Sequence, residues 1–151
     1  MRRNELDFIL STLLDHSKEV SDVVFTVDRP PQVESCGQLV GVPFQPPLER
    51  LTPFQTELIA LNLISGNNRL LQDLLRTGSC DASYTLGDRA RFRVNIFSQR
   101  GNYSIVLRKL NAQIPTIADL ALPDIIIQSS KEKTGLVLVT GATGSGKSST
   151  L

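Results

Sequence analysis

The chain has 151 residues, of which 40% are hydrophobic and 21% charged, and its formal net charge is +1. This composition is typical of a folded protein with a core, and the near-neutral charge argues against a globally basic nucleic-acid coat or an acidic tail. We find neither a run of roughly 20 apolar residues that could span a bilayer nor a secretory signal. We therefore expect a cytosolic protein whose two distant cysteines, Cys36 and Cys80, are reduced thiols.

The N-terminal part predicts a helix followed by short strands. Residues 4–17 place apolar side chains on one helical stripe, with Asn4 as the predicted N-cap: Leu6, Ile9, Leu10, Leu13 and Leu14. A strand is expected over 22–27. After the break at Pro30-Pro31, a strand pair over 32–42 is expected to turn at Gly37.

Two further helices are indicated by their end signals. Thr52-Pro53-Phe54-Gln55 combines a threonine cap, proline at the first helical position and a glutamine that closes a capping box. This helix is expected to run to about residue 64 and to end at Gly66. The next helix is expected from Asn68 to a stop at Gly78, with four leucines facing inward: Leu70, Leu71, Leu74 and Leu75.

The clearest strand signal lies at 89–96, where apolar residues alternate with Arg89, Arg91, Arg93 and Asn95. The sequence Arg100-Gly101-Asn102 favours a turn, and a returning strand is expected over 103–110. A linker, short helices from Thr116 and over 123–130, and a doubly buried apolar strand over 135–139 complete the pattern.

The segment that follows this strand has the pattern G-x-x-x-x-G-K-S of a P-loop. Such a loop cradles phosphate with its backbone N–H groups, while Lys147 neutralises the phosphates and Ser148 ligates Mg²⁺. The alternative is a Gly/Ser-rich connection without function. The candidate nucleotide-binding residues are Gly141, Thr143, Gly144, Ser145, Gly146, Lys147, Ser148 and Ser149.

Phosphoryl transfer also needs an acidic residue on a second strand that holds Mg²⁺ and a residue that positions the attacking water, and neither is expected in the few residues after Lys147. We therefore expect a fragment: an N-terminal domain followed by the beginning of an NTPase domain. We also expect residues beyond about 131 to be disordered or to pair with the sheet of another copy, because the apolar strand lacks partners.

Residues 89–109 hold six cations and no acid: Arg89, Arg91, Arg93, Arg100, Arg108 and Lys109. Three interpretations are open. The arginines belong to a solvated strand face with ion pairs, or they bind a single-stranded nucleic acid whose bases stack on aromatic residues, or they contact nucleotide phosphates. The P-loop on the same chain favours the third interpretation.

Several segments together resemble the N-terminal part of the type IV pilus retraction ATPases, the PilT-like twitching-motility motors of the secretion ATPase superfamily. They are Ser21-Asp22-Val23, Pro30-Pro31, Gly37, Ala90-Arg91-Phe92-Arg93-Val94-Asn95, Arg100-Gly101, and Gly135-Leu136-Val137-Leu138-Val139-Thr140-Gly141 leading into the P-loop. The sequence Cys36-Gly37-Gln38 departs from the Asp-Gly that is usual in this family.

The resemblance implies an α+β fold: a PAS-like domain over 1–110, a linker over 111–116 and the start of a RecA-like ATPase domain over 117–151. It implies a homohexameric motor that hydrolyses ATP with Mg²⁺, sits at the cytoplasmic side of a bacterial inner membrane, engages the pilus platform protein there and binds no nucleic acid. Catalysis is assigned to Lys147, Arg93 and Arg108, with Arg91 and Arg100 as further phosphate contacts. The chain alone is expected to be inactive. The alternative function is a non-catalytic interaction module of a type II or type IV secretion apparatus.

Overall fold

The computed structural model describes residues 3–17, 19–110, 116–142 and 145–150. The chain divides into two compact units, Met1–Ala112 and Gln113–Leu151, which are called unit 1 and unit 2 below and are described separately. No helix among the described residues is long and apolar enough to cross a membrane.

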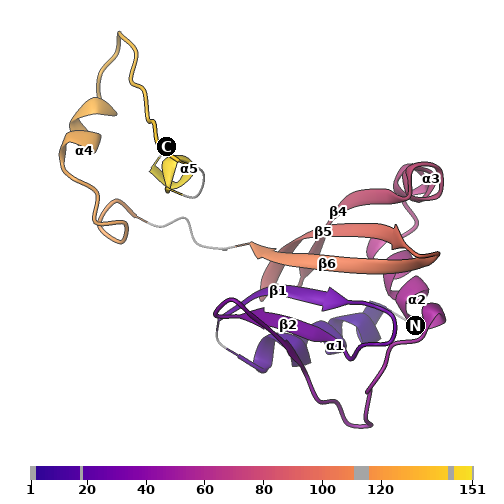
Figure 1. Cartoon of the computed structure of the whole chain (residues 1–151). Helices are drawn as coiled ribbons and strands as arrows, with labels where there is room; N and C mark the ends of the chain where they lie inside the picture. Colours follow the sequence, from indigo (N-terminus) through magenta and orange to yellow (C-terminus); the bar gives the residue numbers. More distant parts are fainter. Residues whose placement is uncertain (1–2, 18, 111–115, 143–144, 151) are drawn as a thin grey trace. The chain divides into compact units, whose positions relative to one another are not determined.

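Unit 1 is an α+β fold built on one six-stranded sheet with the strand order β3-β2-β1-β6-β5-β4 (Figure 1). Each neighbouring pair of strands is antiparallel. The strands are β1 (Val20–Phe25), β2 (Gln32–Ser35), β3 (Gln38–Gly41), β4 (Ser79–Leu86), β5 (Ala90–Gln99) and β6 (Asn102–Leu110). The helices are α1 (Arg3–Asp15), α2 (Pro53–Ile64) and α3 (Asn68–Thr77).

One core is shared by the helices and the sheet. The stripe of α1 is confirmed, because Leu6, Leu10 and Leu13 are fully buried and Ile9 and Leu14 pack against the core. Helix α2 adds four buried apolar residues, which are Ile59, Ala60, Leu63 and Ile64. The strands add the largest group, which includes Val23, Phe25, Phe92, Val94, Ile96, Ile105 and Leu107. Burial of this face leaves the polar residues of the same strands on the opposite face of the sheet.

The predicted hairpin is confirmed and is longer than expected. Ala90, Phe92, Val94 and Ile96 are buried while the intervening Arg91 and Arg93 are exposed. Strand β5 continues to Gln99, and a two-residue turn follows, with Arg100 at φ 53° and Gly101 at φ 78°. Two consecutive residues with positive φ are typical of the tight turns whose twist matches a hairpin.

Strand β4 was not predicted, and it forms the sheet edge next to β5. Its inward residues are Cys80, Tyr84 and Leu86, which a search for strongly apolar alternation does not detect. Strand β1 covers 20–25 rather than 22–27. The strand pair that turns at Gly37 is confirmed by the antiparallel pairing of β2 with β3.

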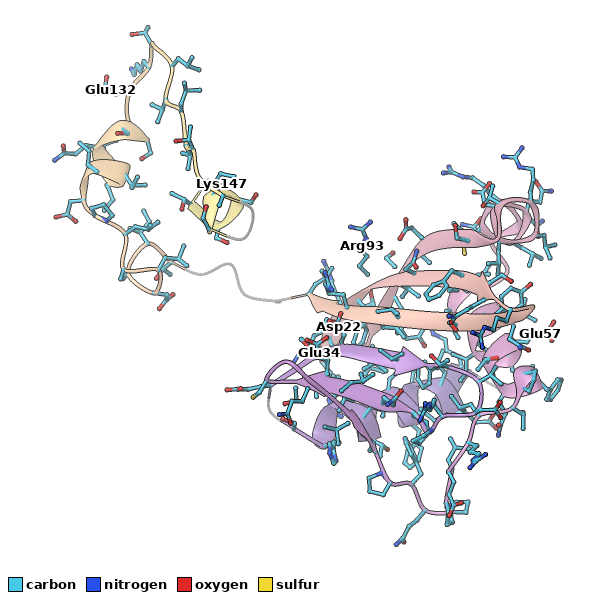
Figure 2. All side chains as sticks on the ribbon, viewed as in Figure 1. Asp22, Glu34, Glu57, Arg93, Glu132 and Lys147 are labelled. Atoms are coloured by element: carbon cyan, nitrogen blue, oxygen red, sulfur yellow. The ribbon has the colours of Figure 1, made fainter. Side chains whose placement is uncertain are left out.

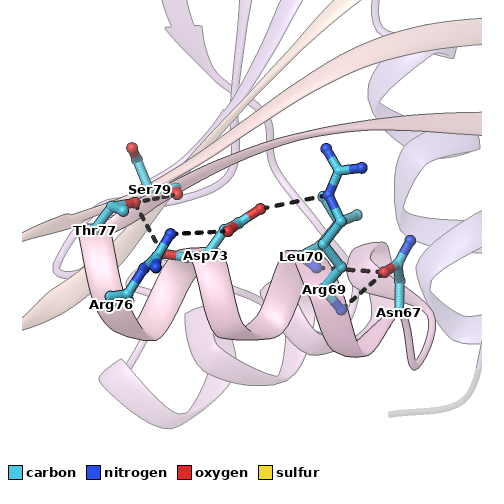
Figure 3. Close-up of polar contacts among 7 residues, drawn as sticks. All are labelled: Asn67, Arg69, Leu70, Asp73, Arg76, Thr77 and Ser79. Atoms are coloured by element: carbon cyan, nitrogen blue, oxygen red, sulfur yellow. Dashed lines mark hydrogen bonds and ion pairs between the residues drawn. The ribbon is translucent and has the colours of Figure 1, made fainter.

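Side-chain capping at the N-terminus explains where α2 and α3 begin. Thr52 accepts a hydrogen bond from the Gln55 N–H, and the Gln55 side chain accepts from the Thr52 N–H, so the predicted capping box is confirmed. Asn67 accepts from two backbone N–H groups at the start of α3, and Asp73 in the middle of this helix contacts Arg69 and Arg76 (Figure 3). Each end therefore satisfies N–H groups that the helix itself leaves without a partner.

Two details of the predicted helices are wrong. Helix α1 begins at Arg3, so Asn4 lies inside the helix and is not its N-cap. Leu75 is 69% exposed, because α3 turns it away from the sheet while Leu74 is buried. The predicted stop at Gly78 is confirmed, since this glycine caps α3 with φ 80°.

Unit 2 contains two short helices, α4 (Ile125–Ser129) and α5 (Lys147–Thr150), and its described residues include no buried residue and no strand. The predicted strand over 135–139 is therefore wrong for this single chain. Leu136 is 82% and Leu138 is 73% exposed. A strand needs a neighbouring strand to accept its backbone hydrogen bonds, and none lies among the described residues of unit 2. The predicted disorder or pairing with another copy stays a prediction.

Candidate functional site

The hairpin of β5 and β6 places two arginines directly opposite each other. Arg93 and Arg108 are register partners, and their side chains are 70% and 69% exposed. Arg93 projects from β5 away from the sheet (Figure 2), and its Nη2 lies 3.7 Å from the Asp81 carboxylate on β4. Like charges directly opposite each other on adjacent strands are unfavourable, so this pair is not accounted for by sheet stability.

Arg108 forms an ion pair with Asp22 on β1. Its Nε donates to Oδ1 of Asp22 at 3.0 Å, and its Nη2 donates to Oδ2 at 3.5 Å. The Asp22 side chain is only 8% exposed. This hydrogen bond, together with the charge of Asp22, raises the pKa of Arg108 above its usual value, so Arg108 is a permanent cation.

A shallow depression of about 380 Å³ lies beside the two arginines. Asp81, Arg93, Asn95, Val106 and Arg108 line it, and Asn95 donates to Asp81 at 3.4 Å. The depression therefore combines two guanidinium groups, which are donors suited to anions, with the Asp81 carboxylate, to which the Asn95 amide donates.

The remaining candidates are distributed unequally along the hairpin. Arg91 lies two residues before Arg93 and shares its exposed face. Arg100 is in the turn, roughly 23 Å farther along the strand at about 3.3 Å per residue, so the structure does not bring it to this face. Arg89 is outside the group, because its Nη2 is 2.6 Å from Asp15 on α1. Three of the arginines thus contact carboxylates, as the first interpretation of the hairpin expected.

Sequence reasoning missed the acidic partners of this face. Asp22 and Asp81 precede the hairpin by many residues, and only strand pairing brings them to it. A signal was present at Asp22, because an acidic residue inside the apolar run Asp22-Val23-Val24-Phe25 needs a cationic partner when the strand is buried.

In unit 2 the P-loop lysine folds over its own loop. Lys147 Nζ donates to the carbonyl oxygens of Gly141 at 2.9 Å and of Ala142 at 2.6 Å. Gly146 has φ 87°, which favours glycine. A Cβ at position 141 would stand 2.5 Å from Ser145 Oγ, so any other residue there would require the Ser145 side chain to move.

The other P-loop candidates lie at the start of α5 or outside the described residues. Ser145, Ser148 and Ser149 are exposed, and the Ser149 N–H donates to the Gly146 carbonyl at 3.0 Å. Thr143 and Gly144 lie outside the described residues. Among the described residues, no group of three or more His, Cys, Asp or Glu side chains could hold a metal ion.

Comparison with known proteins extends these observations. No protein-family model matches the chain. The type IV pilus ATPase PilU of Pseudomonas aeruginosa is 34% identical over 131 residues, which cover 87% of this chain and 33% of PilU. The type IV pilus retraction ATPase PilT of the same organism is 33% identical over 132 residues, or 87% of this chain and 36% of PilT. The chain thus spans about a third of the length of these relatives.

A solved structure gives the same result at the level of the fold. The crystal structure of the pilus retraction motor PilT with bound ADP superposes with a TM-score of 0.81 and 37% identity, covering 96% of this chain and 40% of that one. By sequence and by fold, the chain is a relative of the type IV pilus motor ATPases. More particularly, it corresponds to the N-terminal part of the PilT-like proteins among them.

Proposed function

We propose that this chain is the N-terminal part of an ATP-hydrolysing motor that retracts type IV pili and drives twitching motility. The observation that carries the proposal is the opposed pair Arg93 and Arg108 on an exposed sheet face, in a chain that also holds a complete P-loop sequence. The similarity to an ADP-bound retraction motor supports it.

Within this proposal each group has a chemical task. The P-loop N–H groups and Lys147 bind the phosphates of ATP, and Ser148 contributes its hydroxyl to the Mg²⁺ that accompanies them. In the assembled motor, Arg93 and Arg108 contact the phosphates and stabilise the negative charge that grows on the transferred group, with Arg91 beside them. Such an arginine accelerates phosphoryl transfer by about 10³- to 10⁵-fold.

The same proposal includes the organisation that the resemblance implies. Residues 1–110 form a PAS-like domain, 111–116 a linker, and 117–151 the start of a RecA-like ATPase domain. The motor is a cytoplasmic homohexamer at the inner membrane, where it engages the pilus platform protein. The 151 residues alone do not turn over ATP, because the acidic residue that holds Mg²⁺ and the residue that positions water, both of which hydrolysis requires, lie elsewhere in the motor.

The test is ATP turnover by the full-length protein that contains this chain, with Mg²⁺ present. We expect Arg93→Ala, Arg108→Ala and Lys147→Ala each to lower kcat by about 10³-fold or more. The matched control is Arg89→Ala, since Arg89 pairs with Asp15 outside the depression. The kcat of this variant is expected to stay within about twofold of that of the wild type.

Two results would contradict the proposal. Absence of ATP turnover by the intact protein favours the alternative, a non-catalytic interaction module of a secretion apparatus. Unchanged turnover in Arg93→Ala and Arg108→Ala removes the arginines from the reaction while leaving the P-loop assignment intact.

A further inference from the structure

A row of four charged side chains crosses the exposed face of the sheet. Glu34 on β2 is the register partner of Asp22 on β1, Asp22 is the partner of Arg108 on β6, and Arg108 is the partner of Arg93 on β5. Figure 2 shows Asp22 and Glu34 beside each other on neighbouring strands. Two carboxylates therefore lie on one side of the row and two guanidinium groups on the other.

Asp22 differs from the other acids of this face in its burial. It is the one buried charged residue among the described residues, at 6% exposure. By contrast, the Asp81 side chain, which contacts Arg93, is 60% exposed. A buried carboxylate needs a strong and constant partner, and Arg108 supplies two hydrogen bonds to it.

The direction of these bonds leaves part of the guanidinium available. Arg108 uses its Nε and Nη2 for Asp22, so both bonds lie on one edge of the planar group. The N–H donors of Nη1 lie in the same plane at another edge of the group, because the guanidinium is a rigid planar fork. Arg108 can thus hold Asp22 and an anion at the same time.

We propose that Asp22 is a positioning residue for the nucleotide phosphates: it fixes the Arg108 guanidinium so that Arg108 and Arg93 act together on a polyphosphate oxyanion. The inference rests on the proposed function above. A free arginine loses much rotamer freedom when it binds a ligand. Asp22 has already removed that freedom, and the buried strand holds the carboxylate itself in place.

The opposite arrangement is a competitor, in which Asp22 withholds Arg108 from the phosphates until an anion displaces it. The two arrangements predict opposite effects of removing the carboxylate. Loss of a positioning group lowers kcat, whereas loss of a competitor raises it. Asp22 occupies only the Nε and Nη2 edge of the Arg108 guanidinium. This favours the positioning role, since an anion can bind the Nη1 edge without displacing Asp22.

The first experiment measures ATP turnover of the full-length protein with Asp22→Asn. We expect kcat to fall by about 10- to 100-fold, the usual effect of a misplaced catalytic group. The KM for ATP is expected to change much less than kcat, because loss of one negative charge near the phosphates favours binding while loss of the fixed Arg108 disfavours it. Asp22→Glu, which restores the carboxylate, is expected to recover part of kcat. A purely structural role does not separate kcat from KM in this way.

The matched control is Asp15→Asn, which breaks the other close Arg–Asp pair of unit 1, Arg89 with Asp15, and is expected to leave kcat and KM unchanged. An unchanged or raised kcat in Asp22→Asn overturns the inference. If Arg93→Ala and Arg108→Ala lower kcat in the same assay, the proposed function survives this failure. If neither arginine variant affects kcat, the proposed function fails as well.

A second experiment keeps the inference testable if Asp22→Asn does not fold. The arginine Nε–H signals of the unmodified 151-residue chain are followed by NMR while tripolyphosphate is added. We expect the Arg108 Nε–H to exchange slowly before and after the addition, because it remains bound to Asp22, while the Arg93 signal shifts. Faster exchange at Arg108 on addition means displacement from Asp22 and overturns the inference, as does the absence of any response from both arginines.

Discussion

Unit 1 and unit 2 each carry part of the chemistry expected of a nucleotide motor, but they hold it in different ways. In unit 1 the arginines stand on a sheet whose other face is buried, and neighbouring strands fix both arginine-bearing strands. In unit 2 none of the described residues is buried, and Lys147 is held by carbonyls of its own loop. The P-loop sequence pattern is a local signal, whereas the arginine face exists only once distant strands have paired.

The largest expected difference between the units is in core substitutions. Phe92→Ala removes a fully buried side chain and is expected to lower the free energy of unfolding by about 3–5 kcal/mol. Leu138→Ala, at a residue 73% exposed, is expected to change it by less than about 0.5 kcal/mol. Urea denaturation followed by circular dichroism measures both. A comparable loss in Leu138→Ala would show that unit 2 has a packed core of its own.

A smaller effect is expected at Tyr84 on β4, whose hydroxyl donates to Asp7 on α1 at 2.5 Å. Burial, with a further contribution from this hydrogen bond, raises the pKa of Tyr84 to about 12. Since an unfolded tyrosine has a pKa of about 10, its contribution to stability is complete below about pH 10 and is lost as the pH rises through about 12.

Tyr84→Phe therefore removes a hydrogen bond and a titration at once. We expect a loss of about 1–2 kcal/mol near neutral pH and a weaker fall in stability above about pH 10 than in the unmodified chain. Urea denaturation at about pH 8 measures the loss of stability near neutral pH, and the same measurement at about pH 11 gives the fall in stability at alkaline pH. An equally steep alkaline fall in the variant would assign that fall to other groups.

The smallest expected effects compare two threonines in similar local motifs. Thr52→Ala breaks the capping box of α2, a helix that contributes to the core, and is expected to cost about 1 kcal/mol. Thr116 in unit 2 exchanges hydrogen bonds with Asp119 in the same pattern, yet no buried face depends on it. Thr116→Ala is expected to leave the unfolding midpoint unchanged.

A local readout does exist for Thr116. Its hydroxyl and its backbone N–H both donate to Asp119 and lower the pKa of that carboxyl. In Thr116→Ala the pKa of Asp119 is expected to rise, because the hydroxyl donor is lost, while the backbone donor remains. An NMR titration of the Asp119 side chain measures this. An unchanged pKa would mean that the turn does not form in solution.

Local signals in the sequence were sufficient wherever neighbouring residues decide the structure. The capping box at Thr52, the stop at Gly78 and the alternation along β5 are each confirmed, because the responsible contacts lie within a few residues. Strand β4 was missed because its inward positions include Cys80 and Tyr84 rather than a run of aliphatic residues. Its identity as a strand depends on pairing with β5, which is a long-range property.

The apolar segment 135–139 and Asp22 show the same limit from opposite sides. The segment has the composition of a buried strand, but composition does not supply a neighbour, and Leu136 and Leu138 are exposed. Asp22 is of a residue type that usually lies at the surface. The pairing of β1 with β6 places Arg108 beside it and allows its burial. In both cases the missing information is which segment lies alongside.

The charged row across the sheet also has an effect at a distance. With Glu34 and Asp22 at one end and Arg108 and Arg93 at the other, it forms an electric dipole that lies across the strands. Its field repels an anion that approaches over β1 and β2 and attracts one that approaches over Arg108 and Arg93, while the exposed Asp81 on β4 weakens the attraction at the Arg93 end. This steering acts within roughly 10 Å at moderate ionic strength and weakens as salt is added. The face therefore imposes an orientation on an incoming polyphosphate before the first hydrogen bond forms.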